Sequence, residues 1–148
     1  MQAEEQLKPA IDVTAAVISL DGKVLITQRG EGQHLAGSWE FPGGKLEDGE
    51  TLEECLQREI NEELSISISV GAHIITTTHE YGNKAIKLHA FHASLVSGEL
   101  TLHDHSDAQW VSINELDTYE FAPADLPIIE HLKEHVLFIF SSTTNWGW

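Results

Sequence analysis

In several parts of this chain the apolar residues recur with the short period that is typical of β-strands. Segments of this kind are found at residues 13–20, 23–27, 66–70, 72–81 and 87–96. Asp21-Gly22, between the first two segments, is a strong signal for a two-residue hairpin turn, and the last two are expected to be joined around Gly82-Asn83. The pattern therefore predicts a sheet with at least one hairpin.

A helical period replaces this alternation between residues 51 and 64. Apolar residues are spaced there four apart, at Leu52, Leu56, Ile60 and Leu64. Thr51, followed three residues later by Glu54, has the spacing of a capping box, in which each residue bonds the backbone of the other. We predict a helix over residues 51–64 that begins at this cap.

The last third of the chain predicts further elements. Residues 102–111 end in a strand that carries Trp110, residues 112–115 form a second capping box before a short helix, and an amphipathic helix follows Asp125. Residues 136–140 are apolar and β-prone, and could add an edge strand, cover the domain or join a dimer. The final Trp146-Gly147-Trp148 suggests no role.

Three carboxylates stand on one side of the predicted 51–64 helix. Glu59, Glu62 and Glu63 lie at i, i+3 and i+4, so their Cβ atoms are about 5–6 Å apart, and Arg58 is the only cation of the segment. Like charges this close repel one another, so a further positive charge is expected. Hard divalent cations bind oxygen ligands, and Mg²⁺ is usually held by a few carboxylates together with substrate phosphates. A merely solvated acidic face is the alternative.

Composition narrows the candidate partners. The 148 residues, enough for one domain, hold 8 Lys and Arg against 24 Asp and Glu, a formal net charge of −16. Such a charge disfavours polymeric nucleic acid but not a small polyphosphate bound through metal ions. The histidines at 79, 89, 92, 103 and 105 fit no zinc spacing and are expected to be scattered surface or strand residues. The single Cys55 excludes an internal disulfide and is expected to pack in the interior.

Neither a secretory signal nor a membrane span is indicated. The first ten residues are polar, and no apolar run approaches the length of roughly 20 residues that a spanning helix needs. We therefore expect a cytoplasmic protein that has no membrane partner and is a monomer or a homodimer.

The segment from Gly44 to Ile66 resembles the Nudix box, the signature of hydrolases that act on nucleoside diphosphates linked to another group. The match rests on Gly44, Glu50, Arg58-Glu59-Ile60, Glu62-Glu63 and Ile66. The resemblance implies that Gly44, Glu59, Glu62 and Glu63 bind metal, that Arg58 braces the carboxylates and that Glu50 supports the loop. Ser65 departs from the family, which usually has glycine there, and a left-handed helix end costs a non-glycine residue about 1–2 kcal/mol.

Residues outside the box would contact the rest of the substrate. By resemblance to MutT-like members, Arg29 would lie near the phosphates or the base, Asp104 would be a further metal ligand or base, and Asp125 would reach the nucleobase. The alternatives are an exposed strand-end cation for Arg29, a loop acid for Asp104 and a helix cap for Asp125. In Trp39-Glu40-Phe41, rings could stack on a base and a carboxylate could accept its N–H groups, although part of this segment is expected to pack in the core. Lys45 could contact phosphate or stand exposed.

The resemblance implies the Nudix fold, an α/β/α sandwich around a mixed sheet. We expect residues 1–11 to be a lead-in, 12–134 the Nudix domain and 135–148 a C-terminal extension. The implied reaction is hydrolysis of a nucleoside triphosphate to the monophosphate and pyrophosphate, dependent on Mg²⁺ with Mn²⁺ as a substitute. The substrate would be 8-oxo-dGTP in nucleotide-pool sanitation, or CTP or a modified dCTP.

Other functions share some of these features. A Nudix hydrolase of ADP-ribose, nucleotide sugars or dinucleotides would carry the same box, a non-catalytic Nudix module would bind a ligand without cutting it, and a structural acidic domain would bind no metal. If the chain is such a hydrolase, Glu59, Glu62 and Asp104 are the candidates for the base that accepts the proton of water.

Overall fold

The computed structural model describes residues 9–144, with side chains up to residue 135. Over this range the strands are β1 (Ala10–Leu20), β2 (Lys23–Gln28), β3 (Trp39–Glu40), β4 (Ile66–Tyr81), β5 (Lys84–Gly98) and β6 (Asp107–Val111). The helices are α2 (Leu52–Leu64) and α3 (Leu126–Thr144), with the 3₁₀ turns η1 (Ile113–Thr118) and η2 (Pro123–Asp125). None of the helices described is long and apolar enough to cross a membrane.

Strand β1 lies at the centre of the sheet, whose order is β3-β2-β1-β5-β4, with β6 paired to β2. It runs parallel to β5 and antiparallel to β2, so the sheet is mixed. The predicted hairpin is confirmed, because Asp21 and Gly22 join β1 to β2 and both have positive φ angles, of 52° and 78°.

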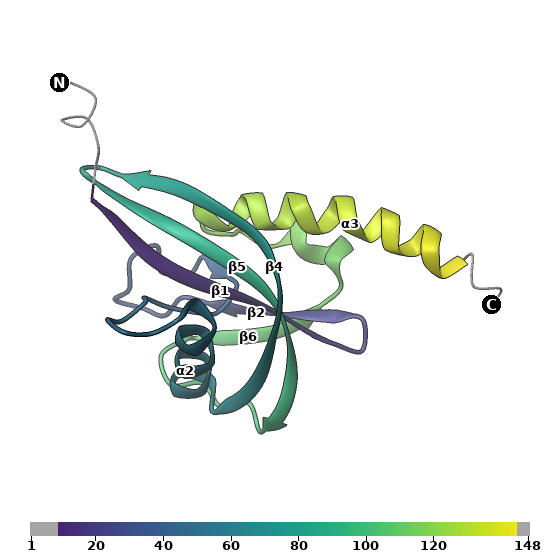
Figure 1. Cartoon of the computed structure of the whole chain (residues 1–148), viewed down its shortest axis with the longest axis horizontal. Coiled ribbons are helices and arrows are strands. Elements are labelled where there is room, and N and C mark those ends of the chain that lie inside the picture. The colour runs from purple at the N-terminus through teal and green to yellow at the C-terminus, as the bar shows by residue number, and fades with distance from the viewer. Residues whose placement is uncertain (1–8, 145–148) are drawn as a thin grey trace.

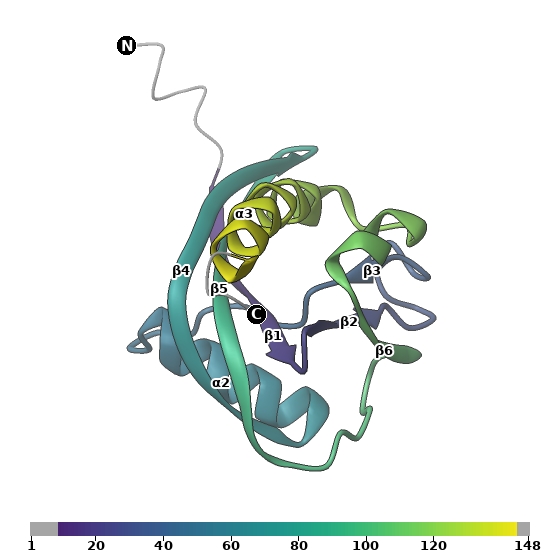
Figure 2. The same cartoon turned by 90° about the vertical axis from the view of Figure 1, so that its right-hand side faces the viewer.

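Alternate residues of β1 point to two different hydrophobic clusters. Ala15 and Val17 belong to the cluster that contains apolar residues of α3, and Ala16 and Ile18 to the cluster that contains Leu56, Ile60 and Leu64 of α2. The two helices accordingly cover opposite faces of the sheet, as Figures 1 and 2 show. This arrangement agrees with the predicted α/β/α sandwich.

The structure corrects three expectations about element boundaries. Residues 66–81 form one strand, with irregular register between Ser67 and Ile75, where two strands were predicted. Strand β1 begins at Ala10, inside the predicted lead-in. Helix α3 continues through the β-prone 136–140, which therefore adds no edge strand. Residues 1–8 and 145–148, including the terminal Trp146-Gly147-Trp148, lie outside the described residues.

The loop before α2 is held against the edge of β1. The backbone N–H of Thr14 donates to the carbonyl oxygen of Gly44 at 2.8 Å, and the N–H of Ala16 donates to that of Pro42 at the same distance. On the other side of the loop, the N–H of Leu46 donates to the carbonyl of Asp12 at 3.0 Å. These bonds hold the glycine-rich turn, which precedes α2 in the chain, beside the central strand.

Candidate active site

Helix α2 begins as the sequence predicts. The Thr51 hydroxyl accepts the backbone N–H of Glu54 at 3.1 Å, and the Glu54 carboxylate accepts that of Thr51 at 2.9 Å, which confirms the capping box. Cys55, Leu56, Ile60 and Leu64 are buried. The helix therefore turns its apolar face to the sheet and leaves its carboxylates on the side of the glycine loop.

The two glycines of the loop stand where a side chain would collide with a neighbour. A Cβ at Gly43 would lie 1.9 Å from the carbonyl oxygen of Thr14, and one at Gly44 would lie 2.2 Å from the carboxyl carbon of Glu59. Neither glycine has a positive φ angle, so the requirement is for space. The backbone of Gly44 thus lies directly against the carboxylate of Glu59.

Arg58 connects this loop to the helix. Its Nε donates to Glu50 Oε2 at 2.5 Å, its Nη1 to Glu59 Oε2 at 2.9 Å and to Glu62 Oε1 at 3.3 Å, and its Nη2 to the carbonyl of Lys45 at 3.1 Å. The bond to Glu50 raises the pKa of Arg58 further above its usual value, and bonds from Arg58 and the Glu47 N–H lower the pKa of Glu50. Both groups therefore remain charged near neutral pH.

Glu63 is the member of the cluster that lacks a cation. Its Oε1 is buried and has no hydrogen-bond partner among the described residues. Burial first, and then the charges of Glu59, Glu40 and Asp104, raise the pKa of Glu63 to about 8. Carboxylates held close together in a partly buried site cost free energy unless a positive charge binds between them. An orphaned oxygen, a neighbouring glycine with no side chain and an all-oxygen donor set fit a hard divalent cation.

The predicted metal ligands do not surround a single point in this structure. Glu59 and Glu62 are turned to Arg58, and Asp104 is exposed in the loop before β6, although its charge acts on Glu63. Among the residues that the structure describes, no group of three or more His, Cys, Asp or Glu side chains is placed to hold a metal ion. The carboxylates would therefore have to reorient around a bound cation.

A second polar group lies where β2 and β3 end. Arg29 Nε donates to Glu40 Oε1 at 3.0 Å, and Arg29 Nη1 donates to the carbonyl of His34 at 3.0 Å. The other oxygen of Glu40, Oε2, is 3.0 Å from His105 Nε2. The charge of Glu40 also acts on Glu63, so this group borders the carboxylates of α2.

Asp125 belongs to the same region through Phe41. Its carboxylate Oδ2 accepts the backbone N–H of Phe41 at 2.8 Å, and the residue is 6% exposed. Burial raises the pKa of Asp125 to about 7; the Phe41 N–H and Arg29 oppose this, and Glu40 adds to it. The side chain thus bonds to a loop 84 residues away, where the sequence also allowed a simple helix cap.

The aromatic residues beside Glu40 pack mainly on the protein. The ring of Phe41 is 3% exposed and lies 5.5 Å from the ring of Phe121, so it is part of the core and does not present a face to a ligand. Trp39 is half-buried, edge-on to Tyr119 at 5.0 Å. Lys45 is exposed, and its backbone carbonyl accepts from Arg58 and Cys55.

Two residues near this site were not predicted to belong to it. Tyr81 lies edge-on to the rings of His34 and His79, and Arg29, Glu40 and Asp125 all act electrostatically on its hydroxyl. The side chain of His105, in the loop before β6, is 4% exposed, whereas a surface or strand position was expected for it. No spacing in the sequence connects either residue to Glu40, because both lie far from it along the chain.

The end of α2 accommodates the Ser65 departure. Ser65 has φ 60° and ψ 30°, the left-handed conformation in which glycine is preferred. Its hydroxyl lies 2.8 Å from His103 Nε2, and the His103 N–H donates to the carbonyl of Glu63 at 3.3 Å. The helix end and the loop that carries Asp104 are thereby joined.

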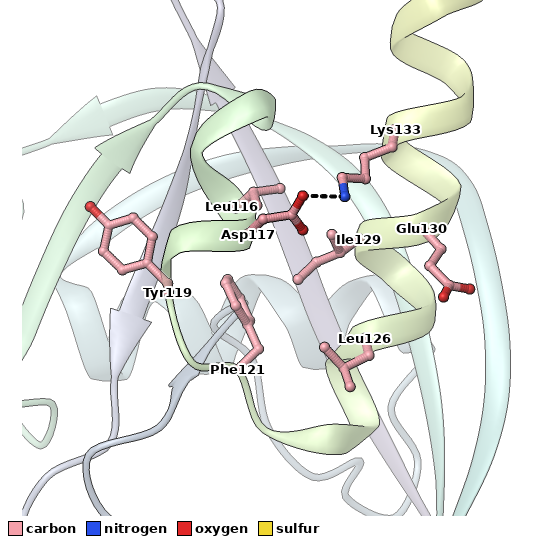
Figure 3. A pocket seen from close by; sticks show the side chains of 8 residues that line it. All are labelled: Leu116, Asp117, Tyr119, Phe121, Leu126, Ile129, Glu130 and Lys133. Carbon is pink, nitrogen blue, oxygen red and sulfur yellow. Dashed lines mark hydrogen bonds and ion pairs between the residues drawn. The ribbon is translucent and has the colours of Figure 1, made fainter.

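A hollow of about 240 Å³ lies away from these carboxylates, between η1 and α3 (Figure 3). Leu116, Phe121, Leu126 and Ile129 form its apolar part, and Asp117 pairs with Lys133 at its rim. Its lining contains none of the residues predicted for catalysis or substrate binding.

This chain is similar in sequence to proteins of a known family. A model of the NUDIX domain matches residues 13–131. A CTP pyrophosphohydrolase of Escherichia coli is 42% identical over 120 residues, covering 81% of this chain and 89% of the relative. An 8-oxo-dGTP diphosphatase of Haemophilus influenzae is 36% identical over 127 residues, covering 84% and 93%.

Solved structures agree with these sequence matches. The solution structure of the E. coli ORF135 protein superimposes with a TM-score of 0.78 at 38% identity, over 86% of this chain and 91% of the other. The crystal structure of a MutT protein from Methanosarcina mazei gives a TM-score of 0.76 at 28% identity, over 86% and 96%.

Proposed function

This chain belongs to the Nudix family of hydrolases, and on that premise we propose that it is a MutT-like enzyme that hydrolyses a nucleoside triphosphate to the monophosphate and pyrophosphate. The observation that carries the proposal is the buried carboxylate oxygen of Glu63, on the face of α2 beside the glycine loop, which has no hydrogen-bond partner within the described part of the chain. An acidic site of this kind suits a substrate that is itself anionic only when cations join the two.

Nudix hydrolases generally use a divalent cation, and here we propose Mg²⁺, with Mn²⁺ as a substitute. Glu59, Glu62 and Glu63 would hold it, together with Asp104 and the backbone of Gly44. A bound divalent cation offsets the charge of phosphate oxygens and makes a water molecule easier to deprotonate. Oxygen ligands and a mixture of carboxylates and substrate phosphates are what Mg²⁺ prefers.

The remaining residues of the box would keep this site in order. Arg58 holds Glu59 and Glu62 by charged hydrogen bonds, and Glu50 ties Arg58 to the loop through the N–H of Glu47. One of Glu59, Glu62 or Asp104 would accept the proton of the attacking water. Lys45, exposed at the edge of the loop, would contact a phosphate of the substrate.

Residues around Glu40 would bind the nucleoside. Glu40 and Asp125 would accept N–H groups of the base, Arg29 would approach a phosphate or the base, and Trp39 would border the base. The relatives named above act on CTP and on 8-oxo-dGTP, so we propose a cytidine-type triphosphate first and 8-oxo-dGTP second. The domain would span residues 12–134, with 135–148 as an extension, and would act in the cytoplasm, where nucleoside triphosphates are used.

The reaction is tested with Glu62→Gln, which keeps the size of the side chain and removes its charge. We expect most Mg²⁺-dependent pyrophosphate release to be lost while the circular dichroism spectrum and melting temperature stay close to wild type. Glu53→Gln, at an exposed position in the first turn of the same helix, is the matched control. Near-normal turnover by Glu62→Gln would overturn the assignment.

The substrate is identified by a panel of 8-oxo-dGTP, dGTP, CTP, dCTP and 5-methyl-dCTP, with ADP-ribose, a nucleotide sugar and a dinucleotide added. Cleavage of only the last three would replace the proposal by another Nudix hydrolase activity. Binding without cleavage anywhere in the panel would support a non-catalytic module, and calorimetry that detects no Mg²⁺ binding would support a structural acidic domain.

A further inference from the structure

The carboxylate of Glu40 is held from two sides. Arg29 Nε donates to Oε1 and His105 Nε2 lies against Oε2, each at 3.0 Å, so neither oxygen is left without a partner. The Glu40 side chain is 17% exposed. Two partners on different oxygens fix the plane of a carboxylate, whereas Arg29 alone would leave it free to turn about its last bond.

The loop that carries His105 is itself anchored at both ends. On one side His103 bonds to Ser65 and to the backbone of Glu63, at the end of α2. On the other side the N–H of Ser106 donates to the carbonyl of Gln28 at 3.0 Å, at the end of β2. Gly30 adds a close backbone contact, because a Cβ there would lie 2.6 Å from the carbonyl oxygen of Asp104. His105 is therefore placed by two of the elements that border the site.

The second ring nitrogen of His105 distinguishes this residue from a histidine that only packs in the core. His105 Nδ1 is buried and has no hydrogen-bond partner among the described residues. His89, buried in β5, bonds with both nitrogens, to Thr76 at 3.1 Å and to Asp12 at 2.9 Å. Buried polar atoms are nearly always paired, so an unpaired one next to a candidate substrate contact indicates a place in the site.

We propose that His105 is a positioning residue for the nucleotide, which acts by holding the Glu40 carboxylate, together with Arg29, in the orientation that accepts an N–H of the base. The inference rests on the proposed function, because it needs Glu40 to face the substrate. Its effect is on binding, since Glu40 would contact the base, whereas the chemistry would be carried by Asp104 and by the carboxylates of α2. Asp104, next to His105 in the chain, keeps a separate role.

Steady-state kinetics of His105→Phe, on the substrate that the panel identifies, test the proposal. A hydrogen bond to a charged group is worth enough that we expect KM to rise about tenfold while kcat changes less than about twofold. His105→Gln keeps an N–H donor near the position of Nε2 and should recover most of the loss. His89→Phe, the matched loss of a buried histidine bonded to a carboxylate, should lower the melting temperature and leave KM unchanged.

A double-mutant cycle shows whether His105 acts through Glu40. In a Glu40→Gln background, His105→Phe should cause little further rise in KM, because the group that it positions is already altered. Additive effects, or a KM of His105→Phe equal to wild type, would overturn the inference. If His105→Phe does not fold, the cycle is run with His105→Leu. A rise in KM that His105→Gln fails to reverse counts against the proposal. A wild-type enzyme that cleaves no nucleoside triphosphate instead refutes the proposed function.

Discussion

Replacing Asp125 by asparagine should make the protein more stable at neutral and alkaline pH. Asparagine has nearly the same shape, and its carbonyl oxygen can still accept the backbone N–H of Phe41, which the carboxylate accepts at 2.8 Å. The substitution therefore removes a buried charge while it keeps the hydrogen bond from the Phe41 N–H. A helix-cap role alone predicts little change in stability, because asparagine and aspartate cap helices about equally well.

The size of the effect follows from the pKa of Asp125, which burial raises to about 7 from an ordinary 3.8. An acid with a higher pKa in the folded state loses stability as the pH rises from the unfolded pKa through the folded one. The wild type should thus lose unfolding free energy between about pH 4 and pH 7. At 1.36 kcal/mol per unit of pKa shift, the largest possible loss of unfolding free energy is about 4 kcal/mol. We expect about 1–2 kcal/mol, because water and neighbouring groups relax around a buried charge.

Urea unfolding of wild type and Asp125→Asn at pH 4, 5, 6, 7 and 8, without divalent cations, measures this difference. The two proteins should be nearly equal at pH 4, and the variant should gain steadily up to pH 7 and then level off. Glu130→Gln, an exposed acid-to-amide change on α3, controls for the general loss of a negative charge. A variant that is less stable than wild type at pH 8, or a difference that does not vary with pH, would refute the reasoning.

Three further predictions concern the base contact, the helix end and the glycine loop. Asp125→Ala should change the ranking of substrates in the panel more than it changes the Mg²⁺ concentration for half-maximal activity; an unchanged ranking would favour a structural role. Ser65→Gly should raise the unfolding free energy by up to about 1 kcal/mol, because relief of the left-handed strain exceeds the loss of an exposed bond to His103; urea unfolding that shows a loss contradicts this. Gly43→Ala should destabilise by more than about 2 kcal/mol, since its Cβ would meet the backbone carbonyl of Thr14 at 1.9 Å; a soluble variant with an unchanged melting temperature would count against the packing described.

Features that depend on residues within one turn of each other were predicted correctly. The cap of α2 needs only Thr51 and Glu54, and the hairpin at Asp21-Gly22 needs only two residues that tolerate positive φ. The pattern failed at residues 136–140, where local β-propensity competes with continuation of a helix that has already begun. Propensity is weak compared with the context in which a segment lies, so the sequence of that segment alone could not decide its structure.

Helical spacing alone places Glu59, Glu62 and Glu63 on one side of a helix, and the resemblance of residues 44–66 pointed to the family. Which of these carboxylates has a buried oxygen with no partner among the described residues depends on what packs against Glu63, so it is known only from the folded chain. The tertiary structure also brought Asp125 to Phe41 and His105 to Glu40, which are 84 and 65 residues apart. No local pattern encodes such contacts, since they exist only once β3 and β6 have both paired with β2 and Phe121 and Ala122 have paired with Trp39.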